Sequence, residues 1–389
     1  MDAQTRILKT LDHEEPDKVP YFEIAITNKE ITTHYGFTPG SLGKALAVAR
    51  FLPFRKKIVD GAVEKREIVV KGMRGLVKFY KDAGIDMIPS VTALFPRKLT
   101  KGGFIDEFGR NMHFEYYKDG TEILGYLGGH FKSFEDYEAW DQPDPNWIAR
   151  LSGFLAGRDV QKELKDEVFV IPSTTGMMEV SWESFGFETF ARILTRSKQA
   201  KKVFDDRGKF MVESVKILAE NDAKLILVYD DYGFKNGLFM SPKQYKEHVF
   251  PWLKRGCAAA HERGAKILLH SDGDLSAILD DIVNDCHVDA LNPIEPTTAN
   301  PDYSIFDIKK RFGDKLSLVG NVSPVMLATG TISEIEAYTK RLMLEIAPGG
   351  GYILASGHTI NPVVTVDRWQ AMLAIREKLG HYPIQGSIT

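Results

Sequence analysis

Histidine and carboxylate side chains lie two residues apart at the end of an apolar run. His270 and Asp272 would point to the same side of an extended chain. A second histidine, His358, follows a later apolar run. Two imidazole nitrogens and a carboxylate oxygen suit zinc and leave a fourth position for water or substrate, and they also suit iron(II) or manganese. The alternative is a hydrogen-bonded turn in which Asp272 caps a helix that begins near Leu275.

Polar and ionisable side chains also follow the other apolar runs of the sequence. If these runs are strands of one barrel, their ends meet at a common rim where catalytic residues gather. We predict that Asp231 and Glu179 orient the substrate or act as acid–base groups there. Four further side chains are expected to contact the substrate: Glu23, Asp230, Asn321 and Trp182.

Each of these residues also has a structural interpretation. Asp230 and Asp231 can form a turn and cap a helix, and Glu179 can be a solvated helix residue. Asn321 can stabilise a loop. From the sequence alone, these structural alternatives stay open beside the functional ones.

Eight short runs rich in β-branched residues alternate with longer amphipathic stretches, which is typical of parallel strands joined by crossover helices. Eight parallel strands close a barrel. We therefore predict an α/β fold with a single (β/α)8 TIM barrel. The predicted strands are residues 19–25, 86–91, 168–172, 225–229, 266–270, 288–292, 316–320 and 352–355.

Residues 98–131 interrupt this alternation of strands and helices, because glycine-rich turns separate short alternating runs there. This pattern predicts a β-hairpin insertion after strand two. The stretch 141–145 has the composition of a linker. Two predicted strands precede it and six follow it, so neither part closes a barrel alone. We expect one domain over residues 1–389, with 383–389 as a tail.

Two local sequence patterns predict helices between the later strands. Ser333 and Glu336 form a capping-box pattern before the last strand. Pro242 opens a helix that Pro251 should kink.

Composition restricts the class of partner. Fifty basic and 53 acidic side chains give a formal net charge of −3, so no global field attracts nucleic acid or an anionic membrane. No apolar run approaches the roughly 18 residues that span a bilayer, and the start of the chain lacks the layout of a signal peptide. Cys257 and Cys286 form no metal-binding or disulfide pattern. We expect a soluble cytoplasmic protein with a small-molecule or protein partner.

Several motifs in the expected order make residues 86–382 resemble the uroporphyrinogen decarboxylase superfamily, which implies the same barrel. True decarboxylases of that family carry paired amino-terminal arginines for the porphyrin carboxylates and a Ser-Asp pair after strand two. This sequence has neither, because strand one runs into Glu23 and strand two into Ser90-Val91-Thr92. The motifs that carry the resemblance are Asp230-Asp231-Tyr232-Gly233, Ser241-Pro242, Leu268-Leu269-His270-Ser271-Asp272-Gly273, Gly320-Asn321-Val322-Ser323-Pro324, Gly330-Thr331, Gly349-Gly350-Gly351 and Ser356-Gly357-His358.

The other branch of the superfamily comprises methyltransferases that pass a methyl group between a substrate and a corrinoid protein. Their zinc is held by a His-X-Cys pair on strand five and a Cys on strand eight. The matching positions here are His270, Asp272 and His358, so both thiolates are replaced by harder ligands. The resemblance therefore implies Zn²⁺, a corrinoid-carrying partner protein and a homodimer, whereas the replaced thiolates disfavour a thiol substrate.

These features lead to one main hypothesis and two alternatives. The main hypothesis is a metal-dependent methyltransferase that demethylates an O-methyl substrate, such as an aryl methyl ether, and passes the methyl group to the corrinoid. The first alternative is a decarboxylase or lyase that acts on a small carboxylate or a tetrapyrrole-like substrate. The second is a corrinoid-binding accessory protein without catalysis.

Overall fold

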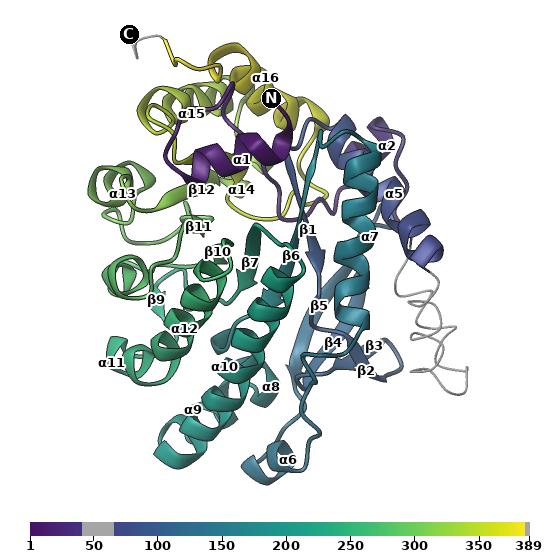
Figure 1. Ribbon diagram of the computed structural model, residues 1–389, viewed down its shortest axis with the longest axis vertical. Coiled ribbons are helices and arrows are strands. Elements are labelled where there is room, and N and C mark those ends of the chain that lie inside the picture. The colour runs from purple at the N-terminus through teal and green to yellow at the C-terminus, as the bar shows by residue number, and fades with distance from the viewer. Residues whose placement is uncertain (41–65, 386–389) are drawn as a thin grey trace.

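Seven parallel strands form the main sheet of the protein (Figure 1). The computed structural model describes residues 1–40 and 66–385. Neighbouring strands are parallel throughout, which confirms the predicted crossover pattern. In sheet order the strands are β1 (Met87–Val91), β6 (Phe169–Thr175), β7 (Leu225–Tyr229), β10 (Lys266–His270), β11 (Ala290–Asn292), β12 (Ser317–Val322) and β13 (Tyr352–Ser356).

The segment that was predicted as strand one lies between the two edges of this sheet. Tyr21 bridges to Leu354 of β13, and Phe22 bridges to Met87 of β1, both in the parallel sense. The segment makes isolated bridges rather than a continuous ladder, and its Pro20 has no N–H to donate. These bridges occupy the eighth position, so the prediction of a (β/α)8 barrel is confirmed.

Helices surround the strands and bury a large apolar cluster against them. None of the helices in the described part of the chain is long and apolar enough to cross a bilayer. The outer helices are α2 (Lys29–His34), α5 (Arg66–Asp82), α6 (Phe134–Glu138), α7 (Ala149–Glu163), α8 (Met178–Phe185), α9 (Phe187–Leu194), α10 (Ser197–Glu220), α11 (Pro242–Gln244), η1 (Tyr245–Val249), α12 (Phe250–His261), η2 (Asp281–Asp285), α13 (Ile305–Phe312), α14 (Pro324–Thr329), α15 (Ile332–Glu345) and α16 (Val366–Leu379).

The two helix signals had different outcomes. The helix that begins after Ser241 changes to the π-helix η1 just before Pro251, and the predicted kink at that proline stays a prediction. The predicted cap of α15 was wrong by two residues. Thr331 is the N-cap, its side chain accepts from the Glu334 N–H, and Ser333 lies inside the first turn. A second Ser/Thr-x-x-Glu pattern in the same stretch explains the error.

The insertion is a four-stranded antiparallel sheet, which confirms the predicted hairpins. It begins slightly earlier than predicted, at Pro96. The last strand approaches α8 so closely that a Cβ on Gly129 would lie 2.2 Å from the backbone of Phe185. A glycine is therefore needed there. The strands are β2 (Pro96–Leu99), β3 (Gly103–Asp106), β4 (Arg110–Tyr116) and β5 (Glu122–Gly129).

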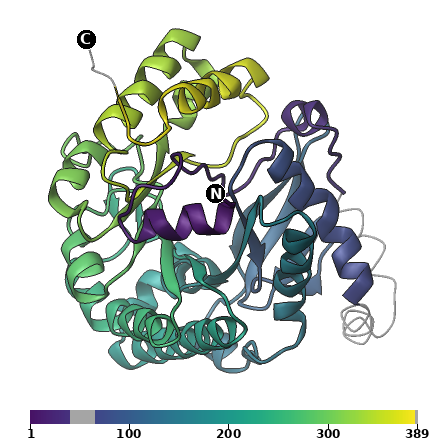
Figure 2. The same ribbon diagram turned by 45° about the horizontal axis from the view of Figure 1, so that its top comes forward.

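Helix α1 (Ala3–Leu11) covers the amino-terminal end of the barrel. Figure 2 shows it lying across the ring of strands and helices. Ala3, Ile7 and Leu11 pack in one buried cluster with side chains from the barrel strands. Since α1 fills this end, the strand ends that remain for a site are the carboxyl ends.

Candidate active site

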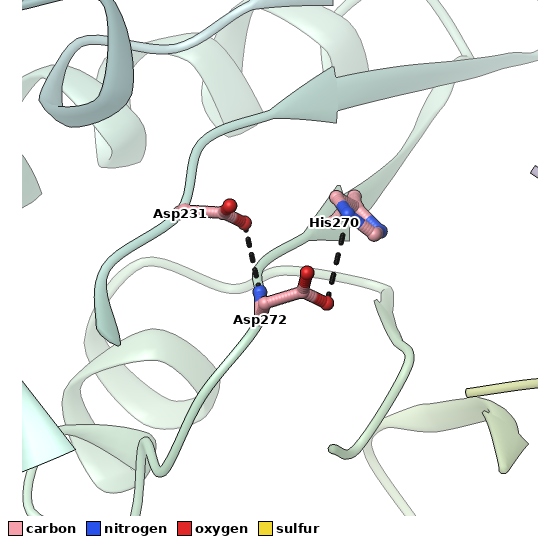
Figure 3. A group of neighbouring side chains, drawn as sticks. All are labelled: Asp231, His270 and Asp272. Carbon is pink, nitrogen blue, oxygen red and sulfur yellow. Dashed lines mark hydrogen bonds and ion pairs between the residues drawn. The ribbon is translucent and has the colours of Figure 1, made fainter. Parts of the chain in front are cut away.

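Asp231, His270 and Asp272 come together at the carboxyl ends of β7 and β10 (Figure 3). The strands pair Tyr229 with His270. Asp231 and Asp272 each follow the last residue of their strand by two positions and lie side by side, and the Asp272 N–H donates to Asp231 Oδ1 at 2.8 Å. One potential ligand atom from each of the three side chains lies within 4.8 Å of the other two.

The ring of His270 is oriented by an asparagine from the next strand. Asn292 Nδ2 donates to the Val319 carbonyl at 3.0 Å, so its Oδ1 faces His270 Nδ1 at 2.7 Å. Nδ1 therefore carries a proton, and Nε2 lies on the side of Asp272, 3.8 Å from its Oδ1, where it can bind a metal once it is deprotonated. Metal-binding histidines are commonly fixed through their second ring nitrogen in this way. Sequence analysis gave Asn292 no role, because only the pairing of β10 with β11 reveals it.

The cluster carries more negative charge than its neighbours balance. Burial, together with the charge of Asp272, raises the pKa of Asp231 to about 7. Burial and the charge of Asp231 raise the pKa of Glu179 to about 7. Burial alone would lower the pKa of His270, but the carboxylates of Asp272 and Asp231 raise it overall. A bound cation would neutralise these carboxylates.

These three side chains fit a divalent cation. Asp272 Oδ1 is buried and accepts no hydrogen bond from the described residues, which leaves it free to act as a ligand. Ligands of four-coordinate zinc lie at about 2.1 Å from the metal and therefore roughly 3.4 Å from one another. The three side chains need only a small inward movement to reach that spacing.

His358 lies at the edge of this cluster. Its Nε2 is 3.5 Å from Asp272 Oδ2, and its side chain is 55% exposed. It is not one of the three side chains whose ligand atoms are mutually close among the described residues. The structure thus brings together two of the three predicted metal ligands and adds Asp231, which was predicted as an acid–base group.

Asp230 connects the cluster to helix α8. Its carboxylate is fully buried and accepts hydrogen bonds from the backbone N–H groups of Met177, Met178 and Glu179, at 2.9, 2.7 and 3.0 Å. Burial raises the pKa of Asp230 to about 7 in spite of these donors. The residue therefore positions Glu179 relative to the neighbouring Asp231.

Glu179 is also held by an arginine from the insertion. Arg110 Nη1 lies 3.1 Å from Glu179 and 2.7 Å from Glu183, and its Nε lies 2.7 Å from Asp106. Arg110 is buried with all three carboxylates around it. Sequence analysis missed it, because the predicted hairpin gave no indication that this strand faces α8.

Glu23 and Asn321 have protein partners for their polar groups. Glu23 Oε1 accepts from the Tyr21 hydroxyl at 2.7 Å and from the Ser356 N–H at 3.1 Å, and burial raises its pKa to about 7. Asn321 Nδ2 donates to the Ile294 carbonyl, while its Oδ1 accepts from the Tyr338 hydroxyl, both at 2.9 Å. The predicted contacts of these two residues with substrate stay predictions.

Comparison with known proteins identifies the family of this chain and agrees with its barrel fold. The family model of uroporphyrinogen decarboxylase (URO-D) matches residues 107–379, and the chain belongs to this family. Over 162 residues it is 24% identical to a uroporphyrinogen decarboxylase from Thioalkalivibrio sulfidiphilus (strain HL-EbGR7). That match covers 41% of this chain and 42% of the relative.

A methyltransferase from Methanosarcina mazei has a similar fold. The TM-score is 0.67 at 19% sequence identity, and the match covers 97% of this chain and 99% of the other. At this identity the likeness concerns the fold.

Proposed function

We propose that this protein is a metal-dependent methyltransferase that takes a methyl group from an O-methyl donor and passes it to a corrinoid protein. The observation that carries the proposal is the Asp231, His270 and Asp272 cluster at the rim of the barrel. The likeness of the fold to a methyltransferase supports it. Zn²⁺ is the proposed ion, and carboxylate-rich donors of this kind also accept manganese or iron(II).

The three side chains of the cluster would hold the ion, and Asn292 would keep His270 in the orientation and tautomer that a ligand needs. When bound, the ion supplies Lewis acidity toward the ether oxygen of the donor. His358 contacts Asp272 and can hold this carboxylate in place.

Glu179 is the proposed general acid. Burial is the largest cause that raises its pKa to about 7, so about half of its carboxyl groups hold a proton at pH 7 and can give it to the departing oxygen. The bond between the methyl carbon and oxygen breaks, and oxygen keeps the electron pair and takes the proton. The electron pair of cobalt(I) in the partner's corrinoid forms the new bond to the methyl carbon.

Decarboxylation of a small carboxylate is the second candidate, favoured by the raised pKa values of Glu179 and Asp231. Such a substrate needs a cation to hold its carboxylate. Arg110 already pairs with three protein carboxylates, which makes methyl transfer the better supported of the two. Decarboxylation without a metal would also be insensitive to chelators, whereas the proposed transfer is not.

Metal content and methyl transfer test the proposal together. The full chain is stripped with a chelator, reloaded with Zn²⁺, dialysed and analysed for metal, and an O-methyl donor is then added with free cob(I)alamin. We expect one zinc per chain and the absorbance change of methylcobalamin. His270→Ala and Asp231→Asn should lose both, while His261→Ala, an exposed histidine paired with Asp289, should keep them. Zinc binding that His270→Ala leaves unchanged would contradict the proposal.

A further inference from the structure

Four aromatic rings form a continuous row beside the cluster. The Trp182 ring on α8 stacks on Phe239, with centroids 5.3 Å apart and planes inclined by 28°. Tyr126 of β5 meets Trp182 edge-on at 5.4 Å, and Phe234 lies 5.6 Å from Phe239. We call these four residues the aromatic wall. It runs from the insertion, across α8, to the short hairpin of β8 (Gly233–Phe234) and β9 (Gly237–Leu238).

Both parts of this wall are attached to the candidate active site. Trp182 follows Glu179 by three residues, so the two side chains lie on the same face of α8. At the other end, Phe234 O accepts from the Asp274 N–H at 3.2 Å. A Cβ on Gly273 would lie only 2.4 Å from Phe234 N, so the hairpin packs directly on the turn that follows Asp272. The aromatic wall therefore adjoins the metal cluster from two sides.

The aromatic wall offers groups that no described protein partner uses. Trp182 Nε1 is buried and donates no hydrogen bond within the described residues. A buried indole N–H usually has a partner, because an unsatisfied donor is costly. Phe234 is 45% exposed, which leaves open apolar surface beside the turn of Asp272. A ligand with a flat apolar body and an oxygen acceptor would use both features.

We propose that Trp182, Phe234 and Phe239 are specificity-determining residues that bind a methoxy-substituted benzene ring, with the Trp182 N–H donating to a ring oxygen. Tyr126 packs edge-on against the Trp182 ring. This inference rests on the proposed function and adds the class of methyl donor to it. Offset or edge-on contact with the aromatic wall would hold the ring next to the cluster.

Calorimetric titration with 2-methoxyphenol tests the inference on the full chain, once loaded with zinc and once in chelator. Trp182→Phe keeps a ring but removes the N–H, and we expect about tenfold weaker binding. Trp182→Leu should bind more weakly still, and Phe234→Leu should also lose affinity. Trp252→Phe is the matched control, because Trp252 donates to Asp205 on the outer helices, and its affinity should not change.

Unchanged affinity for 2-methoxyphenol in Trp182→Leu would overturn the inference, provided that the circular dichroism spectrum of the variant matches that of the parent protein.

The outcome is separable from that of the proposed function. Binding is measured without corrinoid and without turnover, so the aromatic wall can be confirmed even if methyl transfer fails. Conversely, methyl transfer from an aliphatic methyl ether, with no saturable binding of 2-methoxyphenol, would overturn this inference and leave the proposed function standing.

Discussion

The two ends of the barrel differ in whether their buried charges are balanced by charges of the opposite sign. At the amino-terminal end, Arg6 pairs with Asp17 at 2.7 Å and with Asp86 at 2.6 Å, and Arg376 also pairs with Asp86. Two guanidinium groups thus face two carboxylates. At the carboxyl-terminal end, Asp231 and Asp272 share one histidine.

This difference is visible in the pKa values. Hydrogen bonds from Arg6 and its charge hold the pKa of Asp17 well below its usual range, in spite of partial burial. Burial and a like charge instead raise the pKa of Asp231 to about 7. The balanced end stabilises the fold and joins the first and last segments of the chain. At the carboxyl-terminal end the unbalanced carboxylates lower the stability of the fold, but their oxygens stay available as ligand atoms. This is typical of functional sites.

The largest expected effect comes from breaking the balanced end. Asp86→Ala removes the shared partner of Arg6 and Arg376 and the acceptor of the Tyr21 N–H. We expect the free energy of unfolding in urea to fall by about 4 kcal/mol, because Arg6 and Arg376 both lose their buried partner and keep only the more exposed Asp17 and Glu377. Arg74→Ala, which breaks an exposed pair with Glu163, should cost less than about 1 kcal/mol. Similar losses in the two variants would contradict the contrast between buried and exposed pairs.

The second prediction concerns Glu23 and pH. Burial raises its pKa from 4.5 to about 7, so the folded state holds this proton more tightly than the unfolded chain. The resulting stability is complete below about pH 4.5 and is lost as the pH rises through about 7. This difference corresponds to about 3 kcal/mol. Relative to the parent protein, Glu23→Gln should therefore gain about 3 kcal/mol in free energy of unfolding between pH 4.5 and 8.

Asp17→Asn provides the control of opposite sign for this measurement. The lowered pKa of Asp17 means that its contribution is present above its ordinary value of 3.8 and is lost only at lower pH. The difference in free energy of unfolding between Asp17→Asn and the parent protein should stay constant between pH 4.5 and 8. A flat profile for Glu23→Gln over the same range would show that Glu23 is not buried in its neutral form.

The smallest effect on stability is expected from removing one negative charge at the carboxyl-terminal end of the barrel. Asp231→Asn removes a negative charge beside Asp272 but keeps the oxygen that accepts from the Asp272 N–H. In chelator, we expect the variant to be more stable than the parent protein by about 1 kcal/mol. With added Zn²⁺ the parent protein should become the more stable of the two, because only the parent protein gains binding energy from the metal. Asp302→Asn, at an exposed position, should change neither measurement.

Much of the fold could be predicted because its signals are local. Apolar runs and turn residues are properties of short segments, and they located the strands of the main sheet. The first strand was the weakest part of that prediction. Its pairing depends on both edges of the sheet, and Pro20 interrupts its hydrogen bonding.

The sequence by itself determined that His270 and Asp272 lie on one side of a strand end, because side chains two residues apart share a face of an extended chain. Only the tertiary structure decided their neighbours. The register of β7 against β10 places Asp231 beside Asp272, and the pairing of β10 with β11 brings Asn292 to His270. The packing of the insertion on α8 brings Arg110 to Glu179. These contacts join residues that are far apart in the chain, and no local pattern encodes them.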